Sequence, residues 1–195
     1  MSRPIGVDLY SGAGGMSLGF EQAGFDILAS VEIDPIHACV HSYNFPKCTS
    51  IAKSTTDLTG NEIRELSKIG NCSVDVVFGG APCQGFSQIG QRAIDDPRNS
   101  LVRDFVRLVH ELDSDYFVFE NVKGITTGKH VSFLDELIDE FHSRGYKVVT
   151  PWRILNAKNF NTPQSRERLF LLGCKKNLKI PSYPEIQTFT SNGED

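Results

Sequence analysis

The sequence predicts a single doubly wound α/β domain, in which a mostly parallel β-sheet carries helices on both faces. Short runs of β-branched and aromatic residues, typical of buried strands, alternate along the chain with segments whose apolar residues recur at helical spacing. The chain of 195 residues fits one domain comfortably and two poorly, and its 39% hydrophobic residues, with 13 Phe, are enough to form a core. In such sheets the carboxyl ends of the parallel strands meet at one edge, and ligands bind there.

The first half of the chain contains three predicted strands, each an apolar run rich in β-branched residues, at 5–10, 25–31 and 74–78. Helices are predicted between them over 16–23, from 35 to about 43, and over about 60–68. Gly24 lies at the C′ position of the first helix, and Pro35 suits the first turn of the second. A weaker segment after the second helix ends at Asp57.

The second half contains three more predicted strands, at 116–119, 146–154 and 169–174. Helices are predicted between them because apolar residues keep a helical period over 101–112 and 134–141. Asn99 is expected to cap the first of these helices, and Gly145 to stop the second. After Lys175 the chain carries prolines and shows no period, so we predict a loop or linker over 176–195.

Charge and cysteine content limit the classes of function. The net charge of −4 gives no overall basic field for nucleic acid, so any such contact must come from a local patch. Five cysteines without a C-x-x-C pair argue against a disulfide framework and against a zinc site, and they suit a reducing cytosol. The start lacks the apolar region of a signal peptide, and no run of 18 apolar residues occurs. We therefore expect a soluble protein of the cytoplasm or nucleoid, without a metal.

A cysteine lies on a stiff loop directly after the strand 74–78. In the segment 79–87, Pro82 fixes its own φ and biases the preceding residue towards an extended backbone, so Cys83 is held on a rigid turn. Gly79, Gly80 and Gly85 allow another backbone or a flat ligand to approach closely. An isolated Pro-Cys pair is more often an ordinary buried cysteine, so the neighbouring motifs decide how this loop is interpreted.

A glycine-rich turn after the first strand is typical of a nucleotide site. Gly12 permits a tight turn, Gly14 and Gly15 allow close approach, and the helix start offers unpaired N–H groups. Glu32 follows twenty residues after Gly12, at the end of the second strand, where an acid accepts hydrogen bonds from a ribose. Ser17 stands where a full dinucleotide motif has its third glycine. The pattern indicates an adenosine-containing ligand without identifying it, and a capping glycine beside a surface acid is the alternative.

Further polar residues are expected at the same sheet edge. The strand that begins at 116 ends in Glu120 and Asn121, Arg166 and Arg168 lie just before the last strand, and residues 95–99 close the loop after Cys83. Each alone could be a solvated charge. A cysteine, a glutamate and arginines at the ends of different strands together indicate a catalytic site.

Four motifs in this order resemble those of the DNA cytosine-5 methyltransferase family. The cofactor motif resembles residues 8–15, the nucleophile loop 80–87, and the two later catalytic motifs 120–122 and 164–168. Tyr10 stands where the family usually has Phe against the cofactor, so an aromatic ring is kept. The resemblance covers residues 5 to about 174 and implies the Rossmann-like fold of S-adenosylmethionine-dependent methyltransferases.

The resemblance implies S-adenosylmethionine as cofactor, with Glu32 at its ribose and Asp57 at its adenine. The other residues of the implied cofactor site are Tyr10, Ser11, Gly12, Gly14, Gly15, Ile33, Leu58, Gly80, Pro82 and Leu101. The implied substrate is a cytosine flipped out of DNA, because a base inside the duplex cannot be reached. The implied catalytic residues are Cys83 as the nucleophile at C6, Glu120 at the N3 and amino edge, Arg168 at O2, and Arg166 as support.

The family normally continues into a target-recognition domain and a C-terminal segment that completes the cofactor side. We therefore expect a catalytic domain over 1–175, a tail over 176–195 and no target-recognition domain, as in a fragment or a subunit that needs a C-terminal partner. One alternative is a non-catalytic module that binds cofactor or a partner, and another is a tRNA cytosine-5 methyltransferase, although 84–87 follows the DNA-type pattern. A dinucleotide-dependent oxidoreductase is disfavoured because it leaves Cys83 and Glu120 without roles.

Overall fold

The computed structural model describes residues 2–82, 100–128 and 130–188. The strands of this part are β1 (Ile5–Leu9), β2 (Asp26–Val31), β3 (Thr49–Ile51), β4 (Val76–Gly79), β5 (Tyr116–Val122), β6 (Tyr146–Val148), β7 (Arg153–Asn156) and β8 (Glu167–Lys175). Its helices are α1 (Gly15–Gln22), α2 (Pro35–Asn44), α3 (Gly60–Leu66), α4 (Ser100–Glu111) and α5 (His130–Ser143). Single turns of 3₁₀-helix are η1 (Thr55–Asp57), η3 (Lys123–Thr126) and η4 (Ala157–Phe160).

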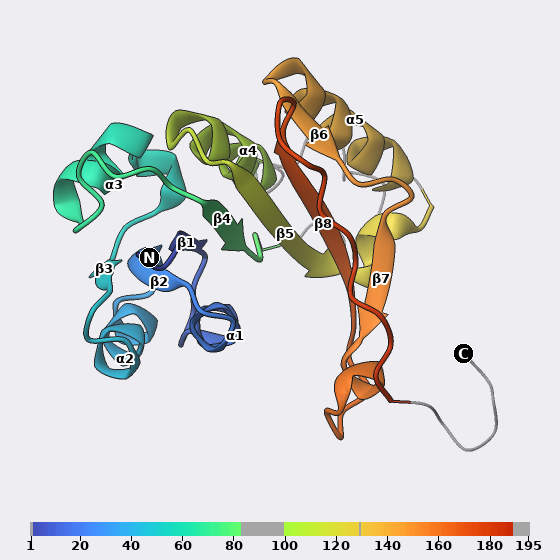
Figure 1. The fold of residues 1–195 in the computed structure, drawn as a ribbon, viewed down its shortest axis with the longest axis horizontal. Coiled ribbons are helices and arrows are strands. Elements are labelled where there is room, and N and C mark those ends of the chain that lie inside the picture. The colour runs from blue at the N-terminus through green and yellow to red at the C-terminus, as the bar shows by residue number, and fades with distance from the viewer. Residues whose placement is uncertain (1, 83–99, 129, 189–195) are drawn as a thin grey trace.

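The strands form one twisted sheet in the order β3-β2-β1-β4-β5-β8-β6, and β7 pairs with β8 next to β6 (Figure 1). Neighbours from β3 through β5 pair in parallel, whereas β8 runs antiparallel to β5, β6 and β7. The predicted α/β class with a mostly parallel sheet is therefore confirmed. Because β8 is antiparallel, its first residues lie at the same edge as the carboxyl ends of the parallel strands.

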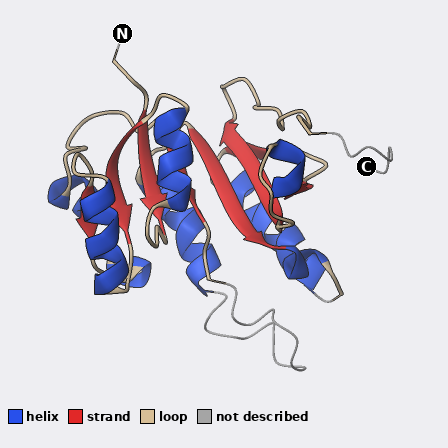
Figure 2. Ribbon diagram, turned by 90° about the horizontal axis from the view of Figure 1, so that it is seen from below, coloured by secondary structure: helices blue, strands red, loops and turns tan. Residues whose placement is uncertain are grey.

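Helices cover both faces of the sheet, as Figure 2 shows. The alternation of side chains along β4 explains why: Val77 lies in the larger core cluster, while its neighbour Phe78 lies in a smaller cluster on the other face. On one face the ring of Phe20 in α1 stacks on Phe78, with ring centroids 3.8 Å apart. On the other face α5 is fixed by the stacking of Phe141 on Phe117, at 3.9 Å. Because β4 is buried on both faces, its sequence is a continuous hydrophobic run that ends at Gly79.

The observed elements differ from the predicted ones in two places that matter for the site. The single strand predicted over 146–154 is wrong, because the structure has two strands, β6 and β7, with Pro151 between them. Proline has no backbone N–H to donate to the ladder, so the strand pairing stops there. Strand β5 runs to Val122, one residue beyond the predicted end at Glu120-Asn121, so Glu120 is paired inside the ladder, opposite Phe170, near the carboxyl end of the strand.

The segment predicted as a loop after Lys175 contains no helix or strand over 176–188. It lies against the sheet rather than away from it, since the Tyr183 hydroxyl donates to the carbonyl oxygen of Phe170 (2.7 Å). Farther along, the N–H of Gln187 donates to the carbonyl oxygen of Asn159 (2.9 Å). The domain boundary at residue 175 stays a prediction. Asn99, the predicted helix cap, lies outside the described residues.

Candidate active site

The carboxyl edge of the sheet brings the predicted site segments together. The glycine turn leaves the end of β1, Glu32 directly follows β2, and Gly80 directly follows β4. Glu120 lies near the end of β5, and Arg168 lies at the start of the antiparallel β8, opposite Val122. The predicted convergence of these residues on one edge therefore agrees with the sheet topology.

The glycine turn requires glycine at two positions. Gly12 and Gly14 have φ values of 53° and 99°, in the region where a side chain is strained. Gly14 is also the N-cap of α1, and a Cβ there would lie 2.1 Å from a ring atom of Phe45. Gly15 begins the helix, and a Cβ at this position would meet no described residue within 4 Å. The turn is thus packed against α2 on one side and open at the start of α1.

Glu32 is held against the glycine turn by two backbone amides. Its Oε2 accepts from the N–H of Gly12 (2.8 Å), and its Oε1 accepts from the N–H of Asp34 (2.9 Å). An ionised carboxylate offers about four acceptor sites, so both oxygens can still accept from the hydroxyls of a ligand. The next residue, Ile33, is 68% exposed and presents an apolar side chain beside them. This arrangement suits a ribose carrying a flat apolar ring.

Tyr10 and Ser11 link β1 to the rest of the site. The Tyr10 hydroxyl donates to the carbonyl oxygen of Leu101 (2.6 Å) and accepts from the hydroxyl of Thr55 (2.9 Å). Burial raises the pKa of Tyr10, so this hydroxyl stays protonated. The Oγ atom of Ser11 is buried without a hydrogen-bond partner among the residues that the structure describes. An unsatisfied buried hydroxyl is costly, so a polar group of a ligand at this turn would relieve it.

The two predicted contacts after β3 differ in exposure. Asp57 ends η1 with an exposed side chain, and its N–H donates to the carbonyl oxygen of Ser54 (3.1 Å). Leu58 is only 2% exposed, and its side chain belongs to the hydrophobic core. Its carbonyl oxygen accepts from Arg107 (3.0 Å). Of the two side chains, that of Asp57 is the one open to a ligand.

Glu120 contacts both predicted arginines. Its Oε1 lies 3.1 Å from Nε of Arg168 and 3.9 Å from Nη2 of Arg166. Burial raises the pKa of Glu120, and the charges of Arg168 and Arg166 oppose this shift without cancelling it. The other oxygen faces the loop after β4, where a Cβ on Gly80 would lie 2.8 Å from Oε2. Glu120 is therefore a carboxyl group that takes up a proton more readily than a surface glutamate and that a Cβ on Gly80 would displace.

Asn121 is a site residue that the sequence reasoning did not select. It is 2% exposed, and its Nδ2 donates to the carbonyl oxygen of Ala81 (3.1 Å). Ala81 precedes the exposed Pro82, which leads to Cys83. Cys83 itself, with the rest of 83–99, lies outside the described residues. The sequence did offer a signal for Asn121, because an amide side chain follows Glu120 directly in a predicted buried strand. A buried polar side chain needs a hydrogen-bond partner, so a contact of Asn121 with a neighbouring segment could have been expected.

A second buried polar group lies beneath the glycine turn. The Ser17 hydroxyl donates to Oδ2 of Asp8 (2.6 Å) and lies 3.0 Å from Nε2 of His41. Burial raises the pKa of Asp8 to about 7, although the hydrogen bond with Ser17 lowers it. Burial lowers the pKa of His41 to about 4. Near pH 6 the structure therefore keeps both groups uncharged, and together they tie β1 to α1 and α2.

Residues 2–82, 100–128 and 130–188 contain neither a metal-binding cluster nor a membrane-spanning helix. No group of three or more His, Cys, Asp or Glu side chains in these ranges could hold a metal ion. None of the helices described there combines the length and the apolar character needed to cross a membrane.

Comparison with protein families and curated sequences gives consistent matches. The profile of the C-5 cytosine-specific DNA methylase family matches residues 6–195. The chain is 57% identical over 194 residues to the type II methyltransferase M.XorII of Xanthomonas oryzae pv. oryzae, covering 100% of this chain and 46% of that protein. It is 41% identical over 189 residues to M1.HphI of Haemophilus parahaemolyticus, covering 93% and 50%. The chain thus spans about half the length of these two relatives.

Solved structures show the same fold. A prophage-encoded E. coli protein assigned to the DNA modification methyltransferases matches with a TM-score of 0.80 and 34% identity, over 92% of this chain and 49% of that one. The crystal structure of a Spodoptera frugiperda DNMT2 mutant matches with a TM-score of 0.71 and 26% identity, over 94% and 54%.

Proposed function

The chain belongs to the C-5 cytosine-specific DNA methylase family, and from this premise we propose that it is the catalytic part of an enzyme that methylates carbon 5 of cytosine in DNA. The observation that carries the proposal is the contact of Glu120 with Arg168 at the carboxyl edge of the sheet, 3.1 Å apart. A carboxyl group with a raised pKa beside a fixed guanidinium suits the N3 and O2 edge of a cytosine ring.

We propose that the methyl donor is S-adenosylmethionine, held at the glycine turn. Glu32 would accept from the ribose hydroxyls, Ile33 would pack on the adenine, and Asp57 would accept from the adenine amino group. Within the part of the chain that the structure describes, the Ser11 hydroxyl has no hydrogen-bond partner and the start of α1 is open, which supports a polar ligand at this turn. The donor supplies a methyl group on a positively charged sulfur, which is a good electrophile. Gly80, Pro82 and Leu101 remain predicted cofactor contacts.

The chain's own residues would have to make cytosine reactive, because C5 is a poor nucleophile. The Cys83 thiolate would form a bond to C6 while the Glu120 carboxyl protonates N3, and Arg168 would donate to O2. The electron pair then available at C5 would accept the methyl group, while the bond from the methyl carbon to the donor sulfur breaks and leaves its electron pair on that sulfur. Loss of the C5 proton to a base, breaking of the bond from the Cys83 sulfur to C6 and return of the N3 proton to the Glu120 carboxylate would restore the ring and both residues. The support for Cys83 is its motif, and the support for Glu120 is its position and pKa.

We further propose that specific DNA binding needs polypeptide beyond the described part, either in the same protein or in a partner subunit. The net charge of −4 provides no broad basic surface, and specific recognition buries about 1,000–2,500 Å². The two relatives described above are about twice as long as the region that matches this chain. This length supports the proposal that further polypeptide supplies DNA-binding surface.

The experiment compares two samples. One is the chain alone, and the other is the chain mixed with the part of the Xanthomonas relative that lies outside the matched region. We call this mixture the complemented protein. Transfer of a labelled methyl group from S-adenosylmethionine to DNA is expected with the complemented protein and not with its Cys83→Ser variant, because a serine hydroxyl is far less acidic than a thiol. DNA containing 5-fluorocytosine should trap a covalent complex, since fluorine cannot leave as the proton does. Binding of S-adenosylhomocysteine without transfer or trapping under any condition would contradict the catalytic proposal.

A further inference from the structure

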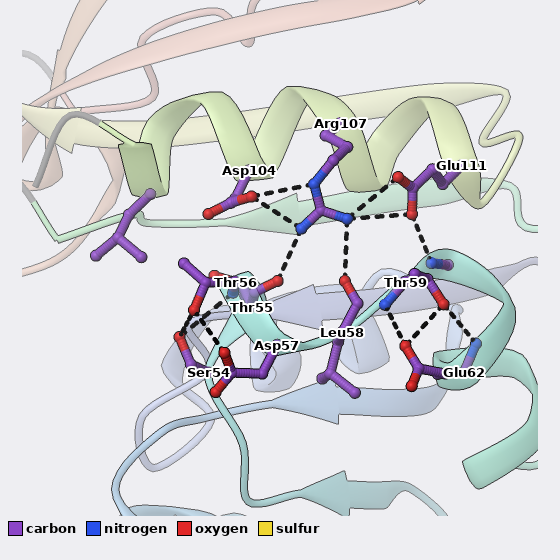
Figure 3. Close-up of polar contacts among 12 residues, drawn as sticks. Ser54, Thr55, Thr56, Asp57, Leu58, Thr59, Glu62, Asp104, Arg107 and Glu111 are labelled. Carbon is purple, nitrogen blue, oxygen red and sulfur yellow. Dashed lines mark hydrogen bonds and ion pairs between the residues drawn. The ribbon is translucent and has the colours of Figure 1, made fainter. Parts of the chain in front are cut away.

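Arg107 on α4 uses every N–H group of its guanidinium. Nε and Nη2 donate to Oδ1 of Asp104 (3.0 and 2.8 Å), one turn earlier on the helix. Nη1 donates to both carboxylate oxygens of Glu111, at 3.2 and 3.1 Å. Figure 3 shows the guanidinium between the two acids, pointing away from α4 towards the chain that follows β3. We call Asp104, Arg107 and Glu111 the α4 clamp.

The remaining two hydrogen bonds of Arg107 cross to a segment about fifty residues earlier in the chain. Nη2 donates to the carbonyl oxygen of Thr55 (2.8 Å), and Nη1 donates to that of Leu58 (3.0 Å). These two carbonyls flank Asp57, one at the first residue of η1 and the other directly after its last. One rigid side chain therefore spans the turn that carries Asp57 (Figure 3).

The same segment is fastened at a third point. Oε2 of Glu111 accepts from the N–H of Gly60 (2.8 Å), at the start of α3. A Cβ on Gly60 would lie 2.7 Å from the backbone carbonyl carbon of Glu111, so the two segments are in close contact. Between these points Thr59 caps α3 through reciprocal hydrogen bonds with Glu62. The backbone from 55 to 60 is thus tied to α4 while the Asp57 side chain stays exposed.

The contacts of the α4 clamp require arginine. Burial alone would lower the pKa of Arg107, but its hydrogen bonds with Asp104 and Glu111 outweigh burial and raise it, so the charge is kept. Lysine would keep the charge, yet its ammonium has three donors and no planar fork. It cannot bond two acids and two separate carbonyls together.

We propose that Arg107 is a positioning residue for adenine recognition: the α4 clamp holds the turn 55–58 so that the carboxylate of Asp57 meets the exocyclic amino group of adenine. This inference rests on the proposed function. Arg107 acts through the backbone on either side of Asp57 and touches no substrate. The preference for adenine over a purine with an oxygen at that position therefore depends on Arg107 as well as on Asp57.

The test compares the binding of S-adenosylhomocysteine and of its inosine analogue, which carries a carbonyl in place of the adenine amino group. Calorimetry on the complemented protein measures the ratio of the two affinities. We expect Asp57→Ala and Arg107→Lys each to lower this ratio about tenfold, the equivalent of one hydrogen bond to a charged group. The matched control is Arg103→Lys, also on α4, whose exposed side chain pairs with Glu136 (3.3 Å) and should leave the ratio unchanged. Equal weakening of both ligands by Arg107→Lys would overturn the inference, because a merely structural role lowers both affinities alike.

A second measurement needs no ligand and keeps the two proposals separate. Hydrogen exchange of the amides from 56 to 60 should become faster in Arg107→Lys than in Arg103→Lys. Exchange equal in the two variants would overturn the clamp whatever the binding data show. A wild-type protein that binds neither compound would instead contradict the proposed function, and with it the part of the inference that concerns adenine.

Discussion

Asn121 donates its side-chain amide to the carbonyl oxygen of Ala81 over 3.1 Å, which joins β5 to the loop that follows β4. Its Oδ1 accepts from the N–H of Val122 (2.8 Å), so both ends of the buried amide are satisfied. Ala81 lies two residues before Cys83. The hydrogen bond therefore holds in place the beginning of the loop after β4, which leads to the proposed nucleophile Cys83.

Asn121→Ala should lower the rate of methyl transfer by about ten- to a hundredfold in the complemented protein. The reason is that the loop before Cys83 loses its anchor, whereas Glu32 and the glycine turn lie on other strands. The affinity for S-adenosylhomocysteine should fall less than the rate, since the contacts proposed at Glu32 and the glycine turn are kept and only the predicted contacts at Gly80 and Pro82, which flank Ala81, are loosened. Single-turnover kinetics and calorimetry separate the two quantities. An equal loss in rate and in affinity would show that Asn121 supports the whole sheet edge and not the loop alone.

The parts of the site that follow from topology could be predicted from the sequence. Glu32 and Gly12 are twenty residues apart, yet each lies just after a parallel strand. Because these strands are neighbours in the sheet, the N–H of Gly12 donates to Oε2 of Glu32 over 2.8 Å. The mostly apolar runs of β1 and β2 made this placement readable, because strands buried on both faces are rich in hydrophobic residues.

Contacts made through side chains from distant helices could not be predicted in the same way. Arg107 lies on an amphipathic helix among other charged residues, and its carbonyl partner in Thr55 is 52 positions away. Nothing in the local pattern distinguishes it from Arg103, which is exposed. The composition of β8 likewise does not distinguish an antiparallel strand from a parallel one. Its direction is known only from the structure. The prediction of one strand over 146–154 missed the break at Pro151. The sequence did contain a signal for this break, because proline interrupts a strand ladder.

Gly80→Ala should reduce methyl transfer at least about tenfold, because its Cβ would lie 2.8 Å from Oε2 of Glu120. The carboxyl group must then move away from the position in which it meets Arg168. The matched control is Gly19→Ala in α1, where a Cβ meets nothing within 4 Å and where alanine favours the helix by about 0.5–1 kcal/mol. Transfer assays on both variants, with denaturant unfolding to confirm folding, test this. Wild-type activity in Gly80→Ala would mean that Glu120 does not need its present position.

Glu32→Ala should weaken S-adenosylhomocysteine binding by about 1–3 kcal/mol, the cost of leaving hydrogen-bonding groups unpaired. It removes the acceptor for any ribose hydroxyl and also the bond that holds the N–H of Gly12. Glu65→Ala, on the exposed side of α3, is the matched loss of one negative charge and should leave affinity unchanged. Calorimetry on the complemented protein gives both values. Unchanged affinity in Glu32→Ala would exclude the acid after β2 as a ribose contact.

The buried pair of Asp8 and His41 predicts two opposing dependences of stability on pH. Burial raises the pKa of Asp8 from 3.8 to about 7, so the folded state holds a proton that the unfolded chain has lost, and this contribution to stability falls as pH rises through that window. Burial lowers the pKa of His41 from 6.5 to about 4, so the unfolded chain binds the extra proton, and this contribution rises with pH between those values. Between about pH 4 and 6.5 the two slopes oppose each other.

Asp8→Asn should remove the first dependence and leave the second. The free energy of unfolding of this variant should then increase by on the order of 1–3 kcal/mol more than that of wild type between pH 4.5 and 6.5, since a difference of one bound proton changes stability by about 1.4 kcal/mol per pH unit. Urea unfolding at the two pH values measures the difference. Asp26→Asn is the control, because Asp26 is a half-exposed partner of Arg3 (3.3 Å) at the start of β2. If Asp8→Asn kept the pH slope of wild type, Asp8 would be ionised in the folded protein. The conclusion that Asp8 is uncharged beneath the glycine turn would then be wrong.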